Sequence, residues 1–309
     1  MRFGLHSGQH HVSFSDLRAL WADAASWGFD ACYVFDHFLP LHSNVESFLP
    51  EEADLGDGPC LEATVALAAL ARAVPKIGVG VMVAGVGYRA AGLFVHTART
   101  LAHAAGTARL EIGIGGGWFE SEYRAFGMPF PPARERMDQL ENALRTLTEA
   151  RADGLDARLW VAGTGEKRLI PLAARYADSW NAMYLTPDEF RGKVDVLERS
   201  CREIGRDPST IERSIALRAF CSRSDASARE ACAEQARRRG RDPQRLAARS
   251  LVGAPEECVA QVARYVEAGA SHVAVMVHPP YDREGLALLT KEVFPAFKEG
   301  TPKFEREAR

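Results

Sequence analysis

The pair Asp36–His37 has the residue types of an acid/base element. It follows Ala31–Phe35, a short apolar segment that is typical of a buried strand. Because histidine titrates near neutral pH, His37 could take up and release a proton during a reaction. In the alternative interpretation, Asp36 caps the loop and His37 is an ordinary polar residue with satisfied hydrogen bonds. The spacing alone leaves both interpretations open.

A run of glycines follows a second apolar segment, Leu110–Ile114. The run and the aromatic residue after it are Gly115, Gly116, Gly117 and Trp118. Glycines at the end of a buried strand let a ligand lie against bare backbone. Trp118 could stack on a planar ring, as could Tyr184 after the segment Ser179–Met183, or either ring could simply pack in the core.

A turn with two glycines is the best phosphate-binding candidate in the sequence. Its residues are Gly163, Thr164 and Gly165. The turn leads into a helix expected from Lys167, and backbone N–H groups at a helix N-terminus bind anions. Lys167 and Arg168 add positive charge there, although a plain glycine turn is the alternative. The sequence has no Walker A motif, and Gly113–Gly117 does not match GxGxxG, so a nicotinamide-binding domain is not expected.

A metal site is not expected. His6, His10, His11 and His37 could converge, but no HxxxH or HxH spacing supports such a site. The six cysteines form no CxxC pair, which is typical of reduced, mostly structural thiols in a cytosolic protein.

The composition disfavours several classes of protein. Of the 309 residues, 47% are hydrophobic and 26% are charged, with a formal net charge of −3, which suits a globular protein with a full core. Without an apolar run that could span a bilayer or serve as a signal peptide, we expect a cytoplasmic protein that is not bound to a membrane. The densest basic run, Arg237–Arg239 with Arg241, is interpreted as a solvated helix face rather than a nucleic-acid site.

Strand-like apolar segments alternate with helical segments along the chain. The expected strands are residues 2–5, 31–35, 77–83, 110–114, 159–162, 179–183, 214–221 and 272–277. Eight such strands in a chain of this length favour a parallel (β/α)₈ TIM barrel with short insertion segments, forming one domain over residues 1–309. The residues that follow the strands would then meet at one end of the barrel, where active sites of this fold lie.

Four segments together resemble the luciferase-like monooxygenase superfamily, and in particular its branch of deazaflavin (coenzyme F420)-dependent oxidoreductases. They are VFDHFLP (34–40), GVGVMVAGVGYR (78–89), RLEIGIGGGWFESEYRAFGMPFPPARERMDQLENAL (109–144) and AGTGEKRLIPLAARYADSWN (162–181). The resemblance implies a TIM barrel with inserted segments and a homodimer. It also implies that Asp36 hydrogen-bonds the polar edge of the deazaflavin and that His37 lies near the reacting ring.

The resemblance assigns further residues to the cofactor. Gly80–Val81 matches a position where family members carry a non-prolyl cis peptide behind the ring. The glycines at 115–117 and Trp118 would flank the side chain of the cofactor, and the turn at 163–165 would hold its phosphate. In the family, a longer insertion usually covers the site, whereas only Thr148–Arg158 is present here, which suggests a more open pocket for a bulky or peptide-like substrate, or a loss of substrate binding.

The resemblance implies an F420-dependent oxidoreductase that transfers a hydride between the cofactor and a small organic substrate. His37 is the first candidate for the proton relay, followed by His6, Tyr184 and His278. The alternatives are an FMN-dependent monooxygenase that uses dioxygen, since the two cofactors share a tricyclic frame, and a cofactor-binding protein without catalysis of its own.

Overall fold

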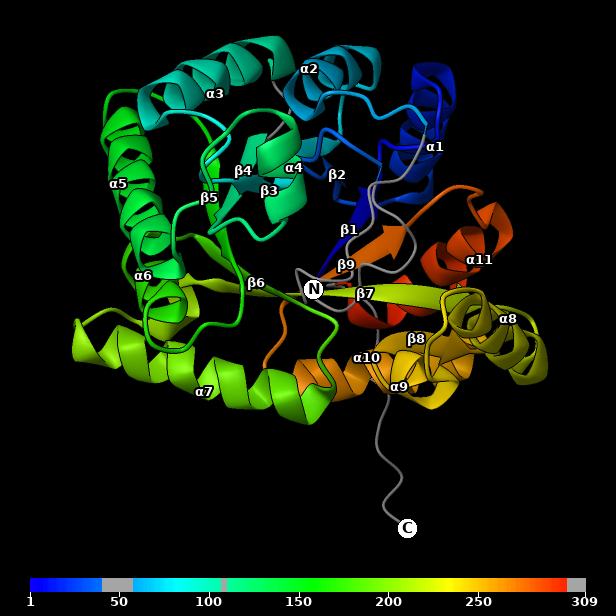
Figure 1. Cartoon of the computed structure of the whole chain (residues 1–309). Coiled ribbons are helices and arrows are strands. Elements are labelled where there is room, and N and C mark those ends of the chain that lie inside the picture. The colour runs from blue at the N-terminus through cyan, green and yellow to red at the C-terminus, as the bar shows by residue number, and fades with distance from the viewer. Residues whose placement is uncertain (41–57, 107–109, 299–309) are drawn as a thin grey trace.

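Eight parallel strands close into a barrel in the computed structural model, which describes residues 1–40, 58–106 and 110–298. The strands are β1 (Arg2–Ser7), β2 (Ala31–Val34), β3 (Gly78–Gly85), β4 (Leu110–Gly115), β5 (Arg158–Ala162), β6 (Ser179–Met183), β7 (Glu212–Cys221) and β9 (His272–Val277). They follow the order β6-β5-β4-β3-β2-β1-β9-β7, and pairing of β6 with β7 closes the ring (Figure 1). The predicted TIM barrel is confirmed.

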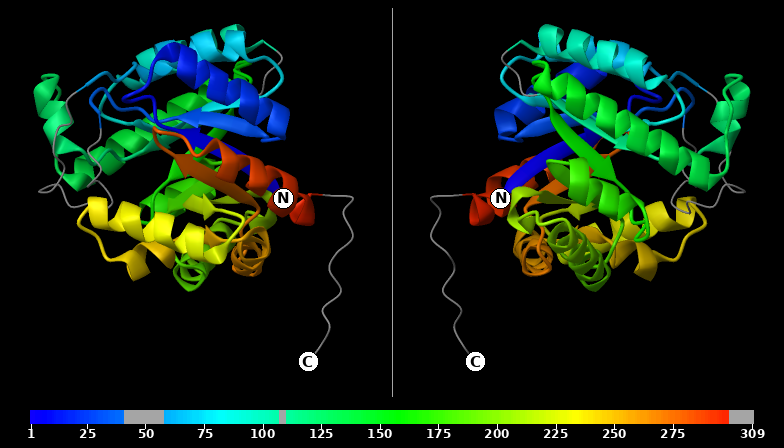
Figure 2. Two further views of the ribbon diagram at one scale, coloured as in Figure 1. Left: turned by 90° about the vertical axis from the view of Figure 1, so that its right-hand side faces the viewer. Right: turned by 90° about the vertical axis from the view of Figure 1, so that its left-hand side faces the viewer.

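Helices surround this barrel on the outside, as Figure 1 shows. In the described part of the chain they are α1 (Phe14–Trp27), α2 (Ala63–Ala73), α3 (Ala91–Ala105), α4 (Glu120–Ala125), α5 (Ala133–Ala152), α6 (Leu169–Tyr176), α7 (Pro187–Glu203), α8 (Asp225–Arg238), α9 (Pro243–Ala247), α10 (Pro255–Glu267) and α11 (Arg283–Leu288). Figure 2 views the barrel from the sides, where α4 and the α8–α9 pair lie at the same end of it. These two insertions are therefore placed to shape the mouth of the barrel.

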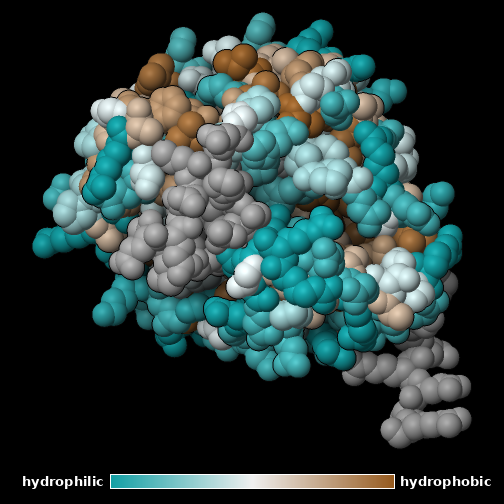
Figure 3. All heavy atoms as spheres, turned by 45° about the vertical axis from the view of Figure 1, so that its right-hand side comes forward, coloured by the Kyte–Doolittle hydropathy of each residue, from teal (hydrophilic) through white to brown (hydrophobic). Residues whose placement is uncertain are grey.

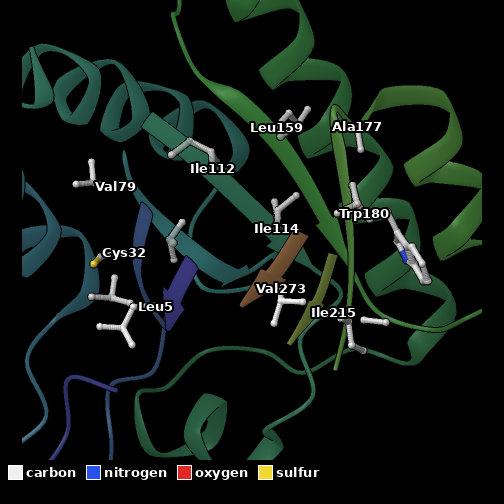
Figure 4. Packing of buried hydrophobic residues seen from close by; sticks show 14 of the residues in the cluster. Leu5, Cys32, Val79, Ile112, Ile114, Leu159, Ala177, Trp180, Ile215 and Val273 are labelled. Carbon is white, nitrogen blue, oxygen red and sulfur yellow. The ribbon is translucent and has the colours of Figure 1, made fainter. Parts of the chain in front are cut away.

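The alternation of side chains along each strand produces two separate layers. Outward-facing apolar residues such as Leu5, Ile112 and Val273 pack against the helices and form the main core (Figure 4). Inward-facing residues of the same strands, among them Tyr33 and Trp160, form a smaller cluster inside the barrel. Residues two apart on a strand thus share a layer, and this places the last inward residue of each strand at the mouth.

A network of charged side chains fills the opposite end of the barrel, where the strands begin. Arg2 binds Glu111 (2.5 Å) and Glu212 (2.8 Å), and the Tyr33 hydroxyl donates to Glu111 (2.8 Å). Arg158 lies 3.3 Å from Glu212. Because buried charges are tolerated only when they are paired, this network fixes the closed end of the barrel and leaves the other end for a ligand.

Some elements differ from those expected. An additional short strand, β8 (Ser250–Gly253), pairs with the end of β7, because β7 extends beyond its contact with β9. No helix was expected at α4, because a helix of six residues is too short to show a recognisable apolar periodicity. The expected helix over 283–298 ends at Leu288 and continues as a π-helical turn and a 3₁₀ turn.

The surface in Figure 3 is hydrophilic over most of its lower half, whereas apolar side chains gather at its upper edge. Val65 of α2 and Leu93 of α3 are among the most exposed large apolar residues that the structure describes. None of the described helices is both long enough and apolar enough to cross a membrane.

Candidate active site

A cavity of about 1340 Å³ opens at the end of the barrel where the strands finish. Its walls include these predicted site residues: Asp36, His37, Gly115, Gly116, Gly117, Trp118, Gly163, Thr164 and Tyr184. Three other predicted residues, Gly80, Val81 and Gly165, are not among the residues that line it. Strand ends scattered along the chain thus converge on one cavity, as a barrel requires.

The central polar feature of this cavity is a buried pair formed by His37 and Glu122. His37 follows β2, and Glu122 lies on α4, 85 residues further along the chain. The Nδ1 atom of His37 lies 2.9 Å from Oε2 of Glu122, and the Glu122 side chain is fully buried. The rings of Phe35 and Trp118 stand edge-on to the His37 ring, at 5.3 and 5.6 Å between centroids, and limit its rotation.

Among the residues that the structure describes, four donors hold Glu122. Its Oε1 accepts hydrogen bonds from the backbone N–H groups of Phe38 (2.7 Å) and Leu39 (3.0 Å), and its Oε2 accepts from His37 and from the Tyr88 hydroxyl. Burial alone would raise the pKa of Glu122, but the His37 and Tyr88 hydrogen bonds and the Leu39 N–H hold it below its ordinary value. Glu122 is therefore a carboxylate at neutral pH.

A carboxylate can only accept hydrogen bonds, so Nδ1 of His37 must carry the proton that it shares with Glu122. In neutral His37 the second ring nitrogen, Nε2, then carries a lone pair. A histidine oriented through one nitrogen by a buried carboxylate is a common arrangement for proton transfer at the other. The pair can accept a proton from a bound molecule and return it.

Asp36 does not point freely into the cavity. Its two oxygens accept from Arg89 at 2.6 and 3.0 Å, and one also accepts from the Gly85 N–H at 3.3 Å. Burial raises the pKa of Asp36 despite the opposing charge of Arg89. Asp36 thus anchors the end of β3, and its predicted hydrogen bond to a cofactor stays a prediction.

The non-prolyl cis peptide joins Met82 to Val83, so its predicted location at Gly80–Val81 is wrong. The register of β3 against β4 shifts between Val81 and Ala84, and the cis peptide lies in this bulge. Gly80 is a glycine for another reason: a Cβ atom there would lie 2.4 Å from the Glu111 carbonyl oxygen. Met82 and Val83, two residues later, line the cavity in its place.

The glycine run after β4 packs tightly against protein as well as facing the cavity. A Cβ atom on Gly116 would lie 2.2 Å from the Met137 methyl group, and one on Gly117 would lie 2.3 Å from the Tyr123 hydroxyl oxygen. Gly117 also has a φ of +70°, which favours glycine. Arg136 of α5 donates to the Gly116 carbonyl at 3.1 Å and fixes the loop. These glycines thus let the chain fit between the cavity and α4–α5.

The turn after β5 begins at the cavity and leads to α6. Gly163 and Thr164 line the cavity, and no side chain in the described part of the chain caps the N-terminus of α6. Arg168, expected to add positive charge at the turn, instead binds Asp138 (2.7 Å) and Glu141 (3.5 Å) on α5. The helix terminus itself, rather than this cation, is therefore the feature that suits an anion here.

Tyr184 and His37 lie on opposite walls. Tyr184 follows β6 and His37 follows β2, which are four strands apart around the ring of eight. The Tyr184 N–H donates to the Ala216 carbonyl (3.1 Å), and the Arg218 guanidinium lies 5.7 Å from the centre of its ring. The two predicted catalytic residues would thus face a bound molecule from two sides.

Several histidines also gather at the mouth. His6, His10, His11 and His278 all line the cavity, and the rings of His10 and His278 lie 5.3 Å apart. Burial lowers the pKa of His6 and of His10 to about 4, so both are neutral at physiological pH. Within residues 1–40, 58–106 and 110–298, no group of three or more His, Cys, Asp or Glu side chains could hold a metal ion.

The basic run, Arg237–Arg239 with Arg241, was expected to form a solvated helix face, and this prediction is correct only for Arg237 and Arg238. Arg237 and Arg238 form ion pairs with Glu230 and Glu234 on exposed α8. Arg239 and Arg241, however, line the cavity. The run straddles the end of α8, where the chain turns inward, and periodicity within a helix does not predict that turn.

Sequence reasoning missed Glu122, Tyr88 and Arg218. Tyr88 lies in the loop after β3, a strand-end position, but it was assigned no role there, and Glu122 lies on the short helix α4, beyond the residues that directly follow β4. Arg218 did leave a signal, because it is a single charge in the apolar strand Ser214–Cys221.

Comparison with known proteins agrees with this architecture. The family model for luciferase-like monooxygenases matches residues 1–272. Among solved structures, an F420-dependent secondary alcohol dehydrogenase in complex with an F420-acetone adduct is 20% identical with a TM-score of 0.76, covering 96% of this chain and 99% of that one. No curated protein matches the sequence.

Two other similar structures are a reductase and a monooxygenase. The F420-dependent tetrahydromethanopterin reductase from Methanopyrus kandleri is 16% identical with a TM-score of 0.72, covering 96% of this chain and 99% of that one. The oxygenating constituent of 3,6-diketocamphane monooxygenase from Pseudomonas putida, in complex with FMN, is 17% identical with a TM-score of 0.73, covering 96% and 98%. At these identities the likeness shows the fold, and the family model shows the kinship: the chain belongs to the luciferase-like monooxygenase family.

Proposed function

We propose that this protein is an F420-dependent oxidoreductase that transfers a hydride between the deazaflavin and a small organic substrate. Membership of a family of oxidoreductases and monooxygenases supports an enzymatic role. The observation that carries the proposal is the buried His37–Glu122 pair at the cavity, because hydride transfer to or from a substrate requires a group that exchanges the accompanying proton.

The cavity fits a phosphate-bearing tricyclic cofactor. Gly163 and Thr164 adjoin the uncapped N-terminus of α6, which suits the phosphate. Apolar side chains of Met82, Val83 and Trp118 line the neighbouring wall and suit a planar ring. These residues, together with the loop at 115–117, would hold the cofactor on the side of the cavity formed by β3, β4 and β5.

When bound, the deazaflavin would supply the carbon that accepts or donates a hydride. The chain itself would handle the proton: Nε2 of His37 would take it from a substrate hydroxyl or return it, while Glu122 keeps the proton on Nδ1. Tyr184 on the opposite wall would orient the substrate.

Cofactor titration tests the proposal directly. Purified protein would be titrated with F420 and, separately, with FMN, while quenching of cofactor and tryptophan fluorescence is followed. Tight binding of F420 with weak or undetectable binding of FMN would support the proposal. A preference for FMN would overturn it in favour of an oxygen-using monooxygenase, comparable to the FMN-bound constituent from P. putida.

A second measurement separates an enzyme from a cofactor-binding protein. With F420 bound, the protein would be mixed with a panel of alcohols, ketones, alkenes and imines, and the absorbance change of the cofactor would be followed. Turnover of any class supports the enzyme, whereas tight binding without turnover across the panel would favour a carrier or sensor.

A further inference from the structure

Two neighbouring side chains at the end of β6 both face the cavity. Side chains along a strand alternate between its two faces, so Met183 and Tyr184 would point in opposite directions if the strand simply continued. Both nevertheless line the cavity. The cause is the backbone of Tyr184, whose φ of +53° lies in the left-handed region, where tyrosine is uncommon. The chain thus turns at Tyr184 and brings its ring to the same wall as Met183.

The structure holds this unusual conformation on both sides. The Tyr184 N–H donates to the Ala216 carbonyl at 3.1 Å, and the Leu185 carbonyl accepts from the Tyr265 hydroxyl at 2.7 Å. The Arg218 guanidinium lies 5.7 Å from the centre of the Tyr184 ring and covers one side of it. A glycine would adopt this φ without strain, so the presence of a tyrosine indicates that the ring itself is needed at the wall.

Thioether side chains are concentrated around the same cavity. Four of the six methionines of the chain line it. Two of them, Met183 on β6 and Met276 on β9, belong with Tyr184 to the apolar cluster inside the barrel. The strand between β6 and β9 is β7, and its residue in this cluster, Ala216, has a small side chain. Methionine is flexible, and its polarisable sulfur makes favourable contacts with aromatic rings.

This wall is separate from the side that suits a cofactor. Met183, Tyr184 and Met276 belong to β6 and β9, whereas the glycine run and the N-terminus of α6 follow β4 and β5. The cavity of about 1340 Å³ exceeds the roughly 300–1,000 Å³ of an ordinary ligand pocket, so it has room for a second molecule beside a cofactor. A molecule that rests on this wall would have the His37 wall opposite it.

We propose that Tyr184, Met183 and Met276 bind an aromatic ring of the substrate, so that the substrate is an aromatic compound whose reacting hydroxyl or carbonyl group faces His37. The proposal rests on the proposed function for its reaction but not for its binding chemistry. Contacts between aromatic rings and between sulfur and an aromatic ring add to the gain from burying apolar surface, and a saturated ring of similar size cannot form them.

The first test compares an aromatic and a saturated probe with the same framework. Benzyl alcohol and cyclohexylmethanol would be titrated by calorimetry into the full-length protein, with and without bound F420. Cyclohexylmethanol is the more apolar of the two, so burial alone would favour it. We expect benzyl alcohol to bind at least about fivefold more tightly. Equal affinities, a preference for the saturated probe, or no detectable binding of either probe would overturn the proposal.

Variants of the wall locate the bound ring. Tyr184→Leu keeps an apolar side chain but removes the aromatic ring, and it should reduce the preference for benzyl alcohol to less than about twofold. Tyr184→Phe keeps the ring and removes the hydroxyl, so the preference should persist. Its loss in the Phe variant would show that a hydrogen bond selects the probe, against the proposal. Met183→Leu removes the sulfur at similar volume and should lower the preference by about twofold.

Tyr176→Leu is the matched control. Tyr176 lies on α6 with the Arg175 guanidinium 6.0 Å from the centre of its ring, and it is not among the residues that line the cavity. The preference should not change in this variant, and an equal preference in Tyr184→Leu and the unaltered protein would contradict the proposal. Thermal unfolding of each variant checks folding. If Tyr184→Leu does not fold, Tyr184→Phe and Met183→Leu carry the test.

The cofactor titration distinguishes this proposal from the proposed function. If Tyr184→Leu weakens F420 or FMN binding and leaves the preference for benzyl alcohol intact, the wall serves the cofactor and the proposal fails. If neither cofactor binds the protein but the preference for benzyl alcohol depends on Tyr184, the aromatic site stands and the proposed function fails.

Discussion

At the scale of single residues, the chemistry of this site depends on where one proton lies. Glu122 accepts from two backbone N–H groups through Oε1 and from His37 and Tyr88 through Oε2. Because the two backbone N–H groups occupy Oε1, the Oε2 atom is the one that accepts from His37. This hydrogen bond fixes the tautomer of His37 with its proton on Nδ1.

Removal of the imidazole tests its role in proton transfer. His37→Ala should spare cofactor binding and reduce turnover by roughly 10²–10⁴-fold, because a positioned general acid/base contributes about that much. The measurement is the steady-state rate together with the cofactor titration. Unchanged turnover would eliminate His37 as the acid/base group and leave Tyr184, His6 and His278 as candidates.

The Glu122→Gln variant tests whether Glu122 positions His37, because it keeps the shape of the side chain and removes its charge. The amide oxygen would stay with the N–H groups of Phe38 and Leu39, so the NH₂ group would face His37 and force Nδ1 to become an acceptor. We expect kcat to fall by about 10–100-fold or more with little change in cofactor affinity, since the wrong tautomer is then favoured.

Tyr88→Phe is the control for this variant. It removes one donor to Glu122 and leaves the other three in place, so its kcat should stay within a few-fold of the unaltered protein. Equal kcat in Glu122→Gln and the unaltered protein would show that the carboxylate has no part in orienting His37.

At the scale of elements, insertions between the strands and helices of the barrel build the site. The insertion after β4 contributes the glycine loop and α4, and α5 fixes both through Arg136, which donates to the Gly116 carbonyl and to the Pro131 carbonyl. Because α4 brings Glu122 to the loop after β2, the insertion after β4 and the loop after β2 stabilise each other.

The glycine loop can be tested by adding one methyl group. In Gly117→Ala, the new Cβ would lie 2.3 Å from the hydroxyl of buried Tyr123, and the alanine would have to adopt a positive φ. We expect a loss of about 1–3 kcal/mol of stability and at least about tenfold weaker cofactor binding, measured by thermal unfolding and fluorescence titration.

Gly165→Ala is the matched control for the loop. Its nearest neighbour would be the Leu169 Cβ at 3.5 Å, which is an ordinary contact, and Gly165 does not line the cavity. If the two variants behave alike, the close packing of Gly117 does not matter for the cofactor.

At the scale of the whole molecule, burial inside the barrel keeps His6 neutral. Burial lowers the pKa of His6 to about 4, against the opposing hydrogen bond that His6 Nε2 donates to the Met82 carbonyl (2.8 Å). The unfolded chain binds a proton at His6 near pH 6.5, and the native protein does so only near pH 4.

This difference predicts how stability depends on pH. The contribution of His6 is complete above pH 6.5 and is lost as the pH falls from there to about 4, by as much as about 3 kcal/mol. Urea unfolding at pH 7.5, 6 and 5 should show this decrease, and His6→Gln should make it smaller. His96→Gln, at an exposed position on α3, should leave the pH dependence as it is, and an equal effect of both variants would refute the prediction.

The sequence by itself determined the barrel and most of its strand ends. Alternating apolar residues mark each strand, and terminators such as Gly28 and first-turn prolines such as Pro187 mark the helices, because these signals act between residues a few positions apart. The sequence pattern alone therefore assigns the loops that follow β2, β4, β5 and β6 to one cavity.

Only the tertiary structure decided which of these residues meet. Three features depend on closure of the barrel. They are the pairing of His37 with Glu122 across 85 residues, the ion pair between Asp36 and Arg89, and the inward turn that places Arg239 and Arg241 at the cavity. No local pattern encodes such contacts, because their partners come from different strand ends and the free energy that joins them is gained only when the ring is complete.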